Sequence, residues 1–208
     1  VILGLQTPDS GVIRLEDADI TRAKPRESLD AGVGFIPEDR STDGIIASFS
    51  IADNLVLDQF RSSSFSSLGS LKRGAITRNA RDKEKEYDIR LTAIEDPVSS
   101  LSGGNQQKVV VAKWLERDTD ILIFDEPTRG IDVGAKDEIY TLLEDLAKQG
   151  KAIIVISSEL PEVLRLANRI AVMAHGRIIG TLNNEDATQE NIMELATVGQ
   201  EEANGVHA

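Results

Sequence analysis

Two neighbouring segments constrain the fold of this chain more than any others. In the first, Leu101–Lys108, a serine and two glycines stand directly before a run of apolar residues with a helical pattern. In the second, Ile121–Pro127, four aliphatic or aromatic residues run into Asp125 and Glu126. Glycine marks a turn, and a short continuous apolar run is typical of a strand buried on both faces. The sequence therefore predicts a glycine turn before one helix and an acidic pair at the end of one strand.

The chain after these segments alternates between strand and helix patterns. Strands are predicted at Ile121–Phe124, Ile153–Ile156 and Ile170–Met173, and helices at Asp137–Lys148 and Leu160–Leu166. Continuous aliphatic strands between amphipathic helices indicate a parallel sheet that is covered on both faces. The predicted fold class is therefore α/β, with a mostly parallel sheet between helices.

The predicted organisation is one domain with a helical subdomain. Its parts are an α/β core at 1–49 and 116–182, a helical subdomain at 50–115, and a C-terminal helix and tail at 183–208. The core includes a short buried strand at Val33–Ile36. Within the subdomain, the serine-rich stretch Ser62–Ser70 is interpreted as a solvated loop rather than a phosphorylation site.

Composition excludes several classes of protein. The 208 residues contain no cysteine, which excludes disulfides and thiolate metal sites. The longest apolar runs, such as Ile153–Ile156, are far shorter than the roughly 20 residues that span a bilayer. No signal-peptide pattern opens the chain, so a soluble, non-secreted protein without a direct membrane span is expected. A net charge of −12 opposes general attraction to DNA, RNA or anionic lipid, so we expect no nucleic-acid partner.

Ser102, Gly103 and Gly104 are candidate phosphate-binding residues. The N-terminal amides of a helix point outward with partial positive charge, and glycine lets a phosphate approach the backbone closely. The serine hydroxyl adds one more donor. The alternative is an ordinary glycine-containing helix start, which an isolated Ser-Gly-Gly would favour and the full stretch through Lys108 disfavours.

Asp125 and Glu126 are a candidate metal ligand and a candidate general base. In phosphoryl-transfer sites, a strand-end aspartate holds Mg²⁺ and a following glutamate can polarise the attacking water. The alternative is that both acids cap the strand end and bind solvent, which the apolar run into Asp-Glu-Pro-Thr disfavours. The Thr128–Asp132 loop follows at once, where it could sense a partner's nucleotide site, although by itself it is only a polar turn.

Four segments together resemble the ATP-binding proteins of ABC transporters, and among them the group that imports monosaccharides of the ribose, galactose, xylose and arabinose type. They are LSGGNQQKVVVAKWL at Leu101–Leu115, where most ABC proteins have LSGGQ, IPEDR at Ile36–Arg40, FDEPTRGIDVGAK at Phe124–Lys136 and ISSEL at Ile156–Leu160. This resemblance covers nearly the whole chain and implies a P-loop NTPase-like ABC core from the C-terminal half of a two-domain protein. The Walker A sequence G-x-x-x-x-G-K-S/T occurs nowhere, so an N-terminally incomplete core, truncated after that loop, is expected.

The resemblance implies a role for each candidate site residue. Glu126 is implied as the catalytic base and Asp125 as the Mg²⁺ ligand. Contacts with ATP are implied for residues of the glycine turn, the loop after the acids and two further positions, namely Ser102, Gly103, Gly104, Gln106, Asp132, Glu38 and Ser158.

Two of these positions depart from the usual ABC pattern. Glu38 stands where a glutamine usually links Mg²⁺ to the permease, and Ser158 stands where a histidine usually contacts the γ-phosphate. Neither His175, interpreted as a turn residue, nor His207, interpreted as a tail residue, replaces that histidine. Such departures imply that the chain's own nucleotide site is degenerate.

The resemblance also implies cofactors and partners. The chain is expected to give its LSGGN turn to ATP and Mg²⁺ held by a second ABC domain, and not to grip ATP strongly by itself. Its other implied partner is a membrane permease subunit, which would contact Ile45–Leu57 or a neighbouring segment; simple subdomain packing is the alternative there. The implied location is the cytoplasm, on the inner face of the plasma membrane.

Two other functions stay open. One is a truncated, non-catalytic interaction or regulatory domain that docks on a permease or a partner ABC domain. The other is an ABC ATPase of nucleic-acid or translation function, which the net charge of −12, the lack of a basic stripe and the Asn-Gln-Gln-Lys after the glycines disfavour. The sequence does not identify the sugar, because specificity lies in the binding protein and the permease.

Overall fold

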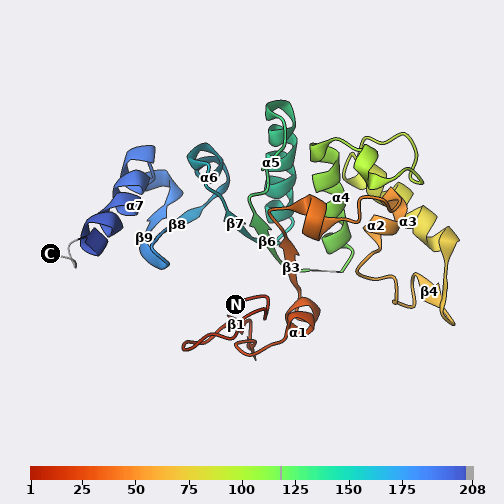
Figure 1. The fold of residues 1–208 in the computed structure, drawn as a ribbon, viewed down its shortest axis with the longest axis horizontal. Coiled ribbons are helices and arrows are strands. Elements are labelled where there is room, and N and C mark those ends of the chain that lie inside the picture. Colours follow the sequence, from red (N-terminus) through yellow and green to blue (C-terminus); the bar gives the residue numbers. More distant parts are fainter. Residues whose placement is uncertain (118, 205–208) are drawn as a thin grey trace. The chain divides into compact units, whose positions relative to one another are not determined.

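A three-stranded parallel sheet organises the first of two compact units in this computed structural model (Figure 1). The structure describes residues 1–117 and 119–204, with residues 198–204 described by their backbone alone. The first unit comprises residues 1–156 and the second comprises residues 157–208. His207, predicted as a tail residue, lies outside the described residues.

The sheet has the strand order β3-β6-β7, with β3 at Val33–Ile36, β6 at Ile121–Asp125 and β7 at Ala152–Ile156. Both pairs are parallel, and Phe124 of the central strand stands opposite Ile36 and Val155. Phe124 is fully buried. The predicted α/β class is confirmed, and so are the strands predicted at Val33–Ile36, Ile121–Phe124 and Ile153–Ile156. Because β6 continues to Asp125, the first acid of the pair stands at the carboxyl edge of the sheet.

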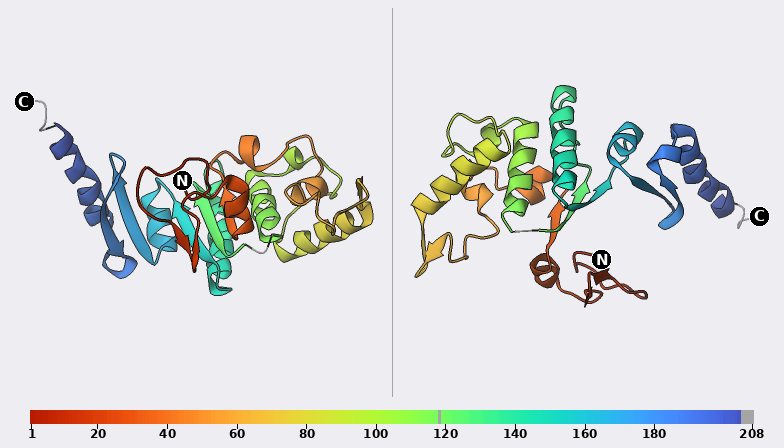
Figure 2. Two further views of the ribbon diagram at one scale, coloured as in Figure 1. Left: turned by 90° about the horizontal axis from the view of Figure 1, so that it is seen from below. Right: turned by 180° about the vertical axis from the view of Figure 1, so that it is seen from behind.

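Two long helices pack beside the sheet: α4 at Gly103–Leu115 and α5 at Val133–Lys148. α4 contacts both β3 and α5, and α5 contacts β7 (Figure 2). Residues 109–112 of α4 are fully buried, so the glycine turn is anchored to the core by the helix that it begins. α5 begins before the predicted Asp137, because the Asp132 carboxylate caps it by accepting a backbone N–H of the first turn.

One face of β7 is more open than the sequence predicts. Ile154 is 43% exposed and Ile156 is 49% exposed, although the uninterrupted aliphatic run predicts burial on both faces. Within the described residues, β7 has a neighbouring strand on one side only and lies at the edge of the sheet. The apolar run therefore correctly predicts that this segment is a strand, but the prediction that both faces of the strand are buried is wrong.

Short elements surround this core. In the first unit they are β1 at Arg14–Leu15, β2 at Ala18–Asp19, α1 at Pro25–Asp30, the π-helix η1 at Arg40–Gly44, α2 at Ile51–Leu55, β4 at Ser66–Ser67, β5 at Ser70–Leu71, α3 at Arg73–Glu86 and the 3-10 helix η2 at Val98–Ser100. α2 packs against α3 and α4, and the assignment of residues 50–115 to a helical subdomain stays a prediction. The predicted serine-rich loop contains a small hairpin, β4–β5, which turns at Leu68 and Gly69 with positive φ at both residues.

A buried amide fastens the segment before α2. The Asn54 side chain is fully buried and accepts from the Ile46 N–H at 2.8 Å. It donates to the carbonyls of Ile46, Phe49 and Ser50 at 3.1, 3.3 and 3.0 Å. The loop that leads from η1 to α2 is therefore shaped by four hydrogen bonds to one side chain.

The second unit is built around an antiparallel hairpin. Its elements are α6 at Leu160–Leu166, β8 at Arg169–Ala174, β9 at Arg177–Asn183, the 3-10 helix η3 at Asn184–Asp186 and α7 at Gln189–Asn204. The strand predicted at Ile170–Met173 lies in β8, which pairs with β9 and not with the parallel sheet. His175 and Gly176, both with positive φ, form the two-residue turn that directs this pairing. The assignment of residues 157–182 to the α/β core stays a prediction. None of the helices in the described residues is long and apolar enough to cross a membrane.

Candidate nucleotide-binding site

The glycine turn forms the N-terminus of α4. Ser102 has an extended backbone, and its carbonyl accepts the Gln106 N–H at 2.9 Å. Its side chain is exposed and makes no capping bond to the helix. The first amides of a helix have no partner within the helix, so they and the Ser102 hydroxyl form a set of donors suited to an anion.

Gln106 has a structural role in the same turn. Its Nε2 donates to the Leu101 carbonyl at 3.0 Å and to the Val98 carbonyl at 3.4 Å. These bonds fix the junction between η2 and α4, which carries the exposed serine. The implied contact between Gln106 and ATP stays a prediction.

Both glycines have close neighbours, which an added Cβ would force to shift. A Cβ added at Gly103 would lie 2.6 Å from Arg40 Nη2 and 3.0 Å from the Gly130 carbonyl oxygen. A Cβ at Gly104 would lie 3.0 Å from the Ala135 Cβ. Phosphate approach is thus only one reason for glycine here, because the protein's own loop and α5 already occupy the space.

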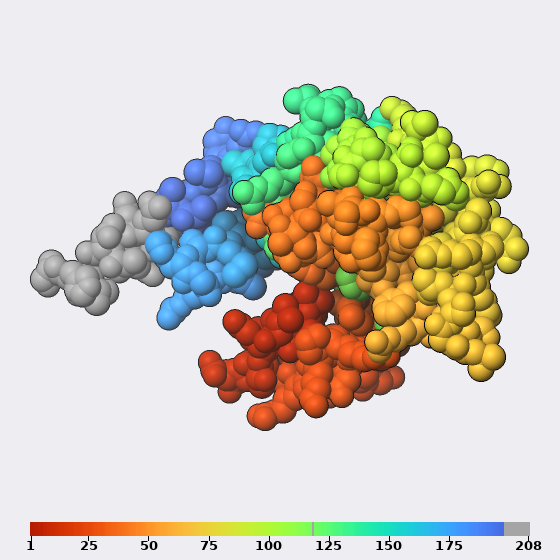
Figure 3. Space-filling view, turned by 45° about the vertical axis from the view of Figure 1, so that its right-hand side comes forward, coloured from red at the N-terminus to blue at the C-terminus, as the bar shows by residue number. Residues whose placement is uncertain are grey.

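Arg40 joins three segments that are distant in sequence. Its Nη1 donates to the Arg129 carbonyl at 2.7 Å and its Nη2 to the Gly130 carbonyl at 3.2 Å, while the same guanidinium lies against Gly103. Figure 3 shows the orange segment that includes η1 against the green helices, in agreement with the contact between η1 and α4. Partial burial lowers the pKa of Arg40, and the Asp39 carboxylate opposes this effect. Arg40 is part of the IPEDR motif, but the sequence did not predict that it joins these segments, because its hydrogen-bond partners are 89 and 90 residues away.

A polar cavity of about 300 Å³ lies beside this arginine, lined by Glu38, Asp39, Arg40, Ser41, Arg129 and Gly130. The Glu38 carboxylate forms an ion pair with the Arg129 guanidinium. The structure therefore brings Glu38, the Thr128–Asp132 loop and the glycine turn together through two arginines.

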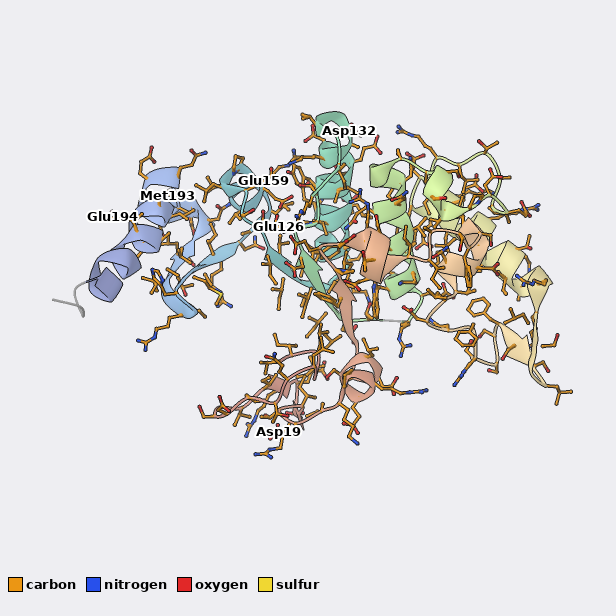
Figure 4. All side chains as sticks on the ribbon, viewed as in Figure 1. Asp19, Glu126, Asp132, Glu159, Met193 and Glu194 are labelled. Carbon is orange, nitrogen blue, oxygen red and sulfur yellow. The ribbon has the colours of Figure 1, made fainter. Side chains whose placement is uncertain are left out.

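Asp125 and Glu126 stand at the end of β6, and Figure 4 shows Glu126 there and Asp132 at the start of α5. Burial raises the pKa of Asp125, and the neighbouring Glu126 carboxylate raises it further. Glu126 adopts a left-handed backbone with φ of 48°, and its N–H donates to the Ile156 carbonyl at 2.8 Å. A non-glycine residue held at positive φ carries strain of a kind that clusters at functional sites. Two adjacent carboxylates also fit Mg²⁺, which takes one or two such ligands and completes its shell with water and phosphate.

The other two predicted residues have different surroundings. The Asp132 carboxylate accepts the Ala135 N–H at 3.0 Å and so caps α5. This capping orients the Thr128–Asp132 loop relative to the helix. Ser158 belongs to the second unit, two residues before the start of α6, and its contact with nucleotide stays a prediction.

Asn105, which no sequence argument singled out, links the exposed serine to the chain before it. Its Nδ2 donates to Ser102 Oγ at 2.9 Å, and its Oδ1 accepts the Arg90 N–H at 2.8 Å. The sequence signal was present, since most ABC proteins have glutamine at this position of the turn. Its structural meaning depends on Arg90, which lies 15 residues earlier.

An ionic cluster holds Arg90 in place. The side chain of Lys108 in α4 is 5% exposed, and its Nζ lies 2.8 Å from Glu138 of α5 and 3.6 Å from Asp88. The Arg90 guanidinium reaches the same two acids at 3.0 and 3.4 Å. The hydrogen bond from Lys108 lowers the pKa of Glu138 despite opposing desolvation.

We expect Glu138→Gln to lower the free energy of unfolding by about 1 kcal/mol at pH 7, since the cluster is partly exposed and solvent screens it. The pKa of Glu138 is lower in the folded chain than the ordinary value of 4.5. This stabilisation is therefore full above pH 4.5 and is lost as the pH falls through the folded pKa. Urea titrations of both proteins at several pH values measure the difference. The exposed Glu95→Gln is the matched control, and a loss that persists at the acid end would contradict the assignment.

Known proteins resemble this chain in sequence. Residues 1–129 match the family model described as ABC transporter. The chain is 46% identical over 199 residues to the ribose import ATP-binding protein RbsA of Lactococcus lactis subsp. cremoris, covering 96% of this chain and 40% of that protein. It is 47% identical over 196 residues to the ribose import ATP-binding protein RbsA 2 of Rubrobacter xylanophilus, covering 94% and 37%. The chain thus spans about two fifths of the length of the curated relatives it matches.

Solved structures share the fold. An ATP-binding cassette of an ABC transporter aligns with a TM-score of 0.77 at 22% identity, over 94% of this chain and 80% of that one. A dimeric ATP-binding cassette, described as a post-hydrolysis state bound to ADP and Pi, aligns with a TM-score of 0.70 at 19% identity, over 88% and 77%. At these identities the likeness establishes the fold alone.

Proposed function

The chain belongs to the ABC transporter family, and from that premise we propose that it acts as part of the ATP-binding subunit of a monosaccharide importer. The observation that carries the proposal is the exposed Ser102 hydroxyl at the N-terminus of α4. The next residue, Gly103, lies against Arg40, which donates to two carbonyls of the Thr128–Asp132 loop. The names of the ribose import relatives support the substrate class.

The glycine turn serves ATP held by a second ABC domain. ABC sites form between two domains, one with the Walker A and B segments and the other with the signature turn. In this chain the signature turn is the glycine turn formed by Ser102, Gly103 and Gly104. Ser102 and the amides of Gly103 and Gly104 donate hydrogen bonds, while ATP supplies the phosphoanhydride bond that is cleaved.

The chain's acids belong to its own half-site. Asp125 is the Mg²⁺ ligand and Glu126 the base that orients water, in agreement with their place at the carboxyl edge of the sheet. Glu38, in place of the usual glutamine, leaves that half-site with little or no turnover. The productive reaction therefore takes place at the site that the signature turn completes.

Coupling to transport takes place through a permease in the membrane. The exposed part of the segment Ile45–Leu57, which the buried Asn54 shapes, is the docking surface; it includes Ile46 and Phe49, which are 37% and 45% exposed. Such a subunit works on the cytoplasmic side of the membrane, attached through the permease.

Calorimetry tests whether the signature turn serves nucleotide held elsewhere. Titrated alone with Mg-ATP, the chain is expected to bind with a Kd above about 1 mM, weaker than about −4 kcal/mol. Mixed with the Walker A-containing ABC domain of the same transporter, it is expected to associate in the presence of ATP and not with ADP, which lacks the terminal phosphate. Micromolar binding by the chain alone, or association that does not depend on ATP, would contradict the proposal.

A further inference from the structure

The side chain of Asn105 lies between the backbone N–H of Arg90 and the hydroxyl of Ser102 in the signature turn. Its Oδ1 is 2.8 Å from the Arg90 nitrogen, and its Nδ2 is 2.9 Å from Ser102 Oγ. The two ends of an amide have nearly the same shape, so their assignment rests on the hydrogen bonds they make. The Arg90 N–H can only donate, so the end that faces it is the oxygen. The NH₂ end must then face Ser102.

This orientation sets the polarity of the serine hydroxyl. An NH₂ group offers hydrogens and no acceptor, so Ser102 Oγ accepts from Asn105 with one of its lone pairs. The hydroxyl proton therefore cannot point at Asn105. Ser102 is exposed, and its proton is left to point away from Asn105 and toward solvent.

A phosphate oxygen accepts hydrogen bonds, so a hydroxyl stabilises it only when the proton faces it. We propose that Asn105 is a positioning residue, which fixes the Ser102 hydroxyl as a donor to the terminal phosphate of ATP. This inference rests on the proposed function of the signature turn. Asn105 acts through Ser102 and does not itself need to touch the nucleotide.

The ionic cluster of Asp88, Arg90, Lys108 and Glu138 keeps the backbone N–H of Arg90 in place. Arg90 lies in the connection after α3, and its guanidinium is 3.0 Å from Glu138 of α5. Lys108 of α4 binds the same carboxylate at 2.8 Å and the Asp88 carbonyl at 2.9 Å. Because Lys108 is on the same helix as Asn105, the donor and the amide are fixed to one rigid element.

The first test uses nitrogen-15 NMR of the ligand-free chain to detect the hydrogen bonds of Asn105 with Arg90 and Ser102. Asn105→Ala removes the acceptor, and exchange of the Arg90 amide proton with solvent is expected to accelerate about tenfold. Asn105→Asp keeps an oxygen there, so Arg90 stays protected. Ser102→Ala leaves Arg90 unchanged and shifts the side-chain amide resonance of Asn105. Unchanged exchange in Asn105→Ala would overturn the inference.

The second test reads ATP turnover in the native transporter. In Asn105→Ala the hydroxyl proton regains the staggered position that faced Asn105 and has three positions in place of two, so turnover falls only about 1.5-fold. In Asn105→Asp a carboxylate, which only accepts, captures the hydroxyl proton. Turnover then falls at least about tenfold below that of Asn105→Ala, because the charge-assisted bond must break before the proton can reach the phosphate.

A matched background separates this effect from charge repulsion. In Ser102→Ala no hydroxyl is left, so the aspartate and alanine variants at 105 still differ in charge, size and the bond to Arg90, but no longer in the capture of a hydroxyl proton. We expect the gap in turnover between them to shrink at least about threefold in that background. An equal gap in both backgrounds would overturn the inference about Asn105. Wild-type turnover in Ser102→Ala would instead overturn the proposed function of the signature turn.

Discussion

Ser102→Arg is expected to lower ATP turnover of the native transporter at least about a hundredfold. The substituted side chain fills the space in front of the α4 amides, and a phosphate held by the partner domain can no longer reach them. Ser102 is exposed and makes no capping bond, so its substitution should change the free energy of unfolding by no more than about 0.5 kcal/mol. Turnover in proteoliposomes and urea unfolding of the chain measure the two quantities.

Ser99→Arg is the matched control for this prediction. Ser99 is also exposed and lies in η2, three residues before Ser102. Its substitution therefore adds the same charge and volume as Ser102→Arg, but outside the signature turn. Its turnover is expected to stay within about twofold of wild type. Equal activities for the two arginine variants would show that the signature turn does not serve ATP.

Gly103→Ala is expected to lower turnover about a hundredfold and the free energy of unfolding by about 1–2 kcal/mol. The added Cβ would lie 2.6 Å from Arg40 Nη2 and 3.0 Å from the Gly130 oxygen. The arginine can move, but the carbonyl belongs to the backbone, so the turn and the loop must separate. That separation displaces the amides that face the phosphate.

Two further variants test this explanation. Arg40→Ala/Gly103→Ala removes the first clash and keeps the second, so its losses should be smaller than the sum of the two single losses. Gly74→Ala in α3 is the control, since nothing lies within 4 Å of the added Cβ, and it should be neutral or slightly stabilising. Additive losses, or full turnover in Gly103→Ala, would contradict direct contact between Gly103 and Arg40.

The sequence predicted those parts of the fold that depend on local patterns. The aliphatic runs of β3 and β6 identified buried strands, and the glycines before the apolar stretch identified the start of α4. The pairing of β8 with β9 was missed because a continuous apolar run does not distinguish a parallel from an antiparallel neighbour. The start of α5 was missed because the Asp132 cap is followed by a valine and a glycine, which are weak helix formers.

The candidate site was predictable to a similar extent. Local motifs identified Ser102, Asp125 and Glu126, and the structure places each at the end of the expected element. The hydrogen bonds of Arg40 with the loop and of Asn105 with Arg90 join residues 15 to 90 positions apart, so no local pattern contains them. The residues that orient the site therefore required the three-dimensional arrangement.

The guanidinium of Arg40 has a thermodynamic consequence. It binds carbonyls of the Thr128–Asp132 loop while lying against Gly103, so the conformation of the loop is coupled to that of the signature turn. If phosphate at the signature turn favours one arrangement of that loop, linkage requires the arrangement to favour phosphate by the same free energy. Under the proposed function, the half-site of this chain would then be an effector of the site that the signature turn completes, and Arg40 would contribute to the coupling free energy between them.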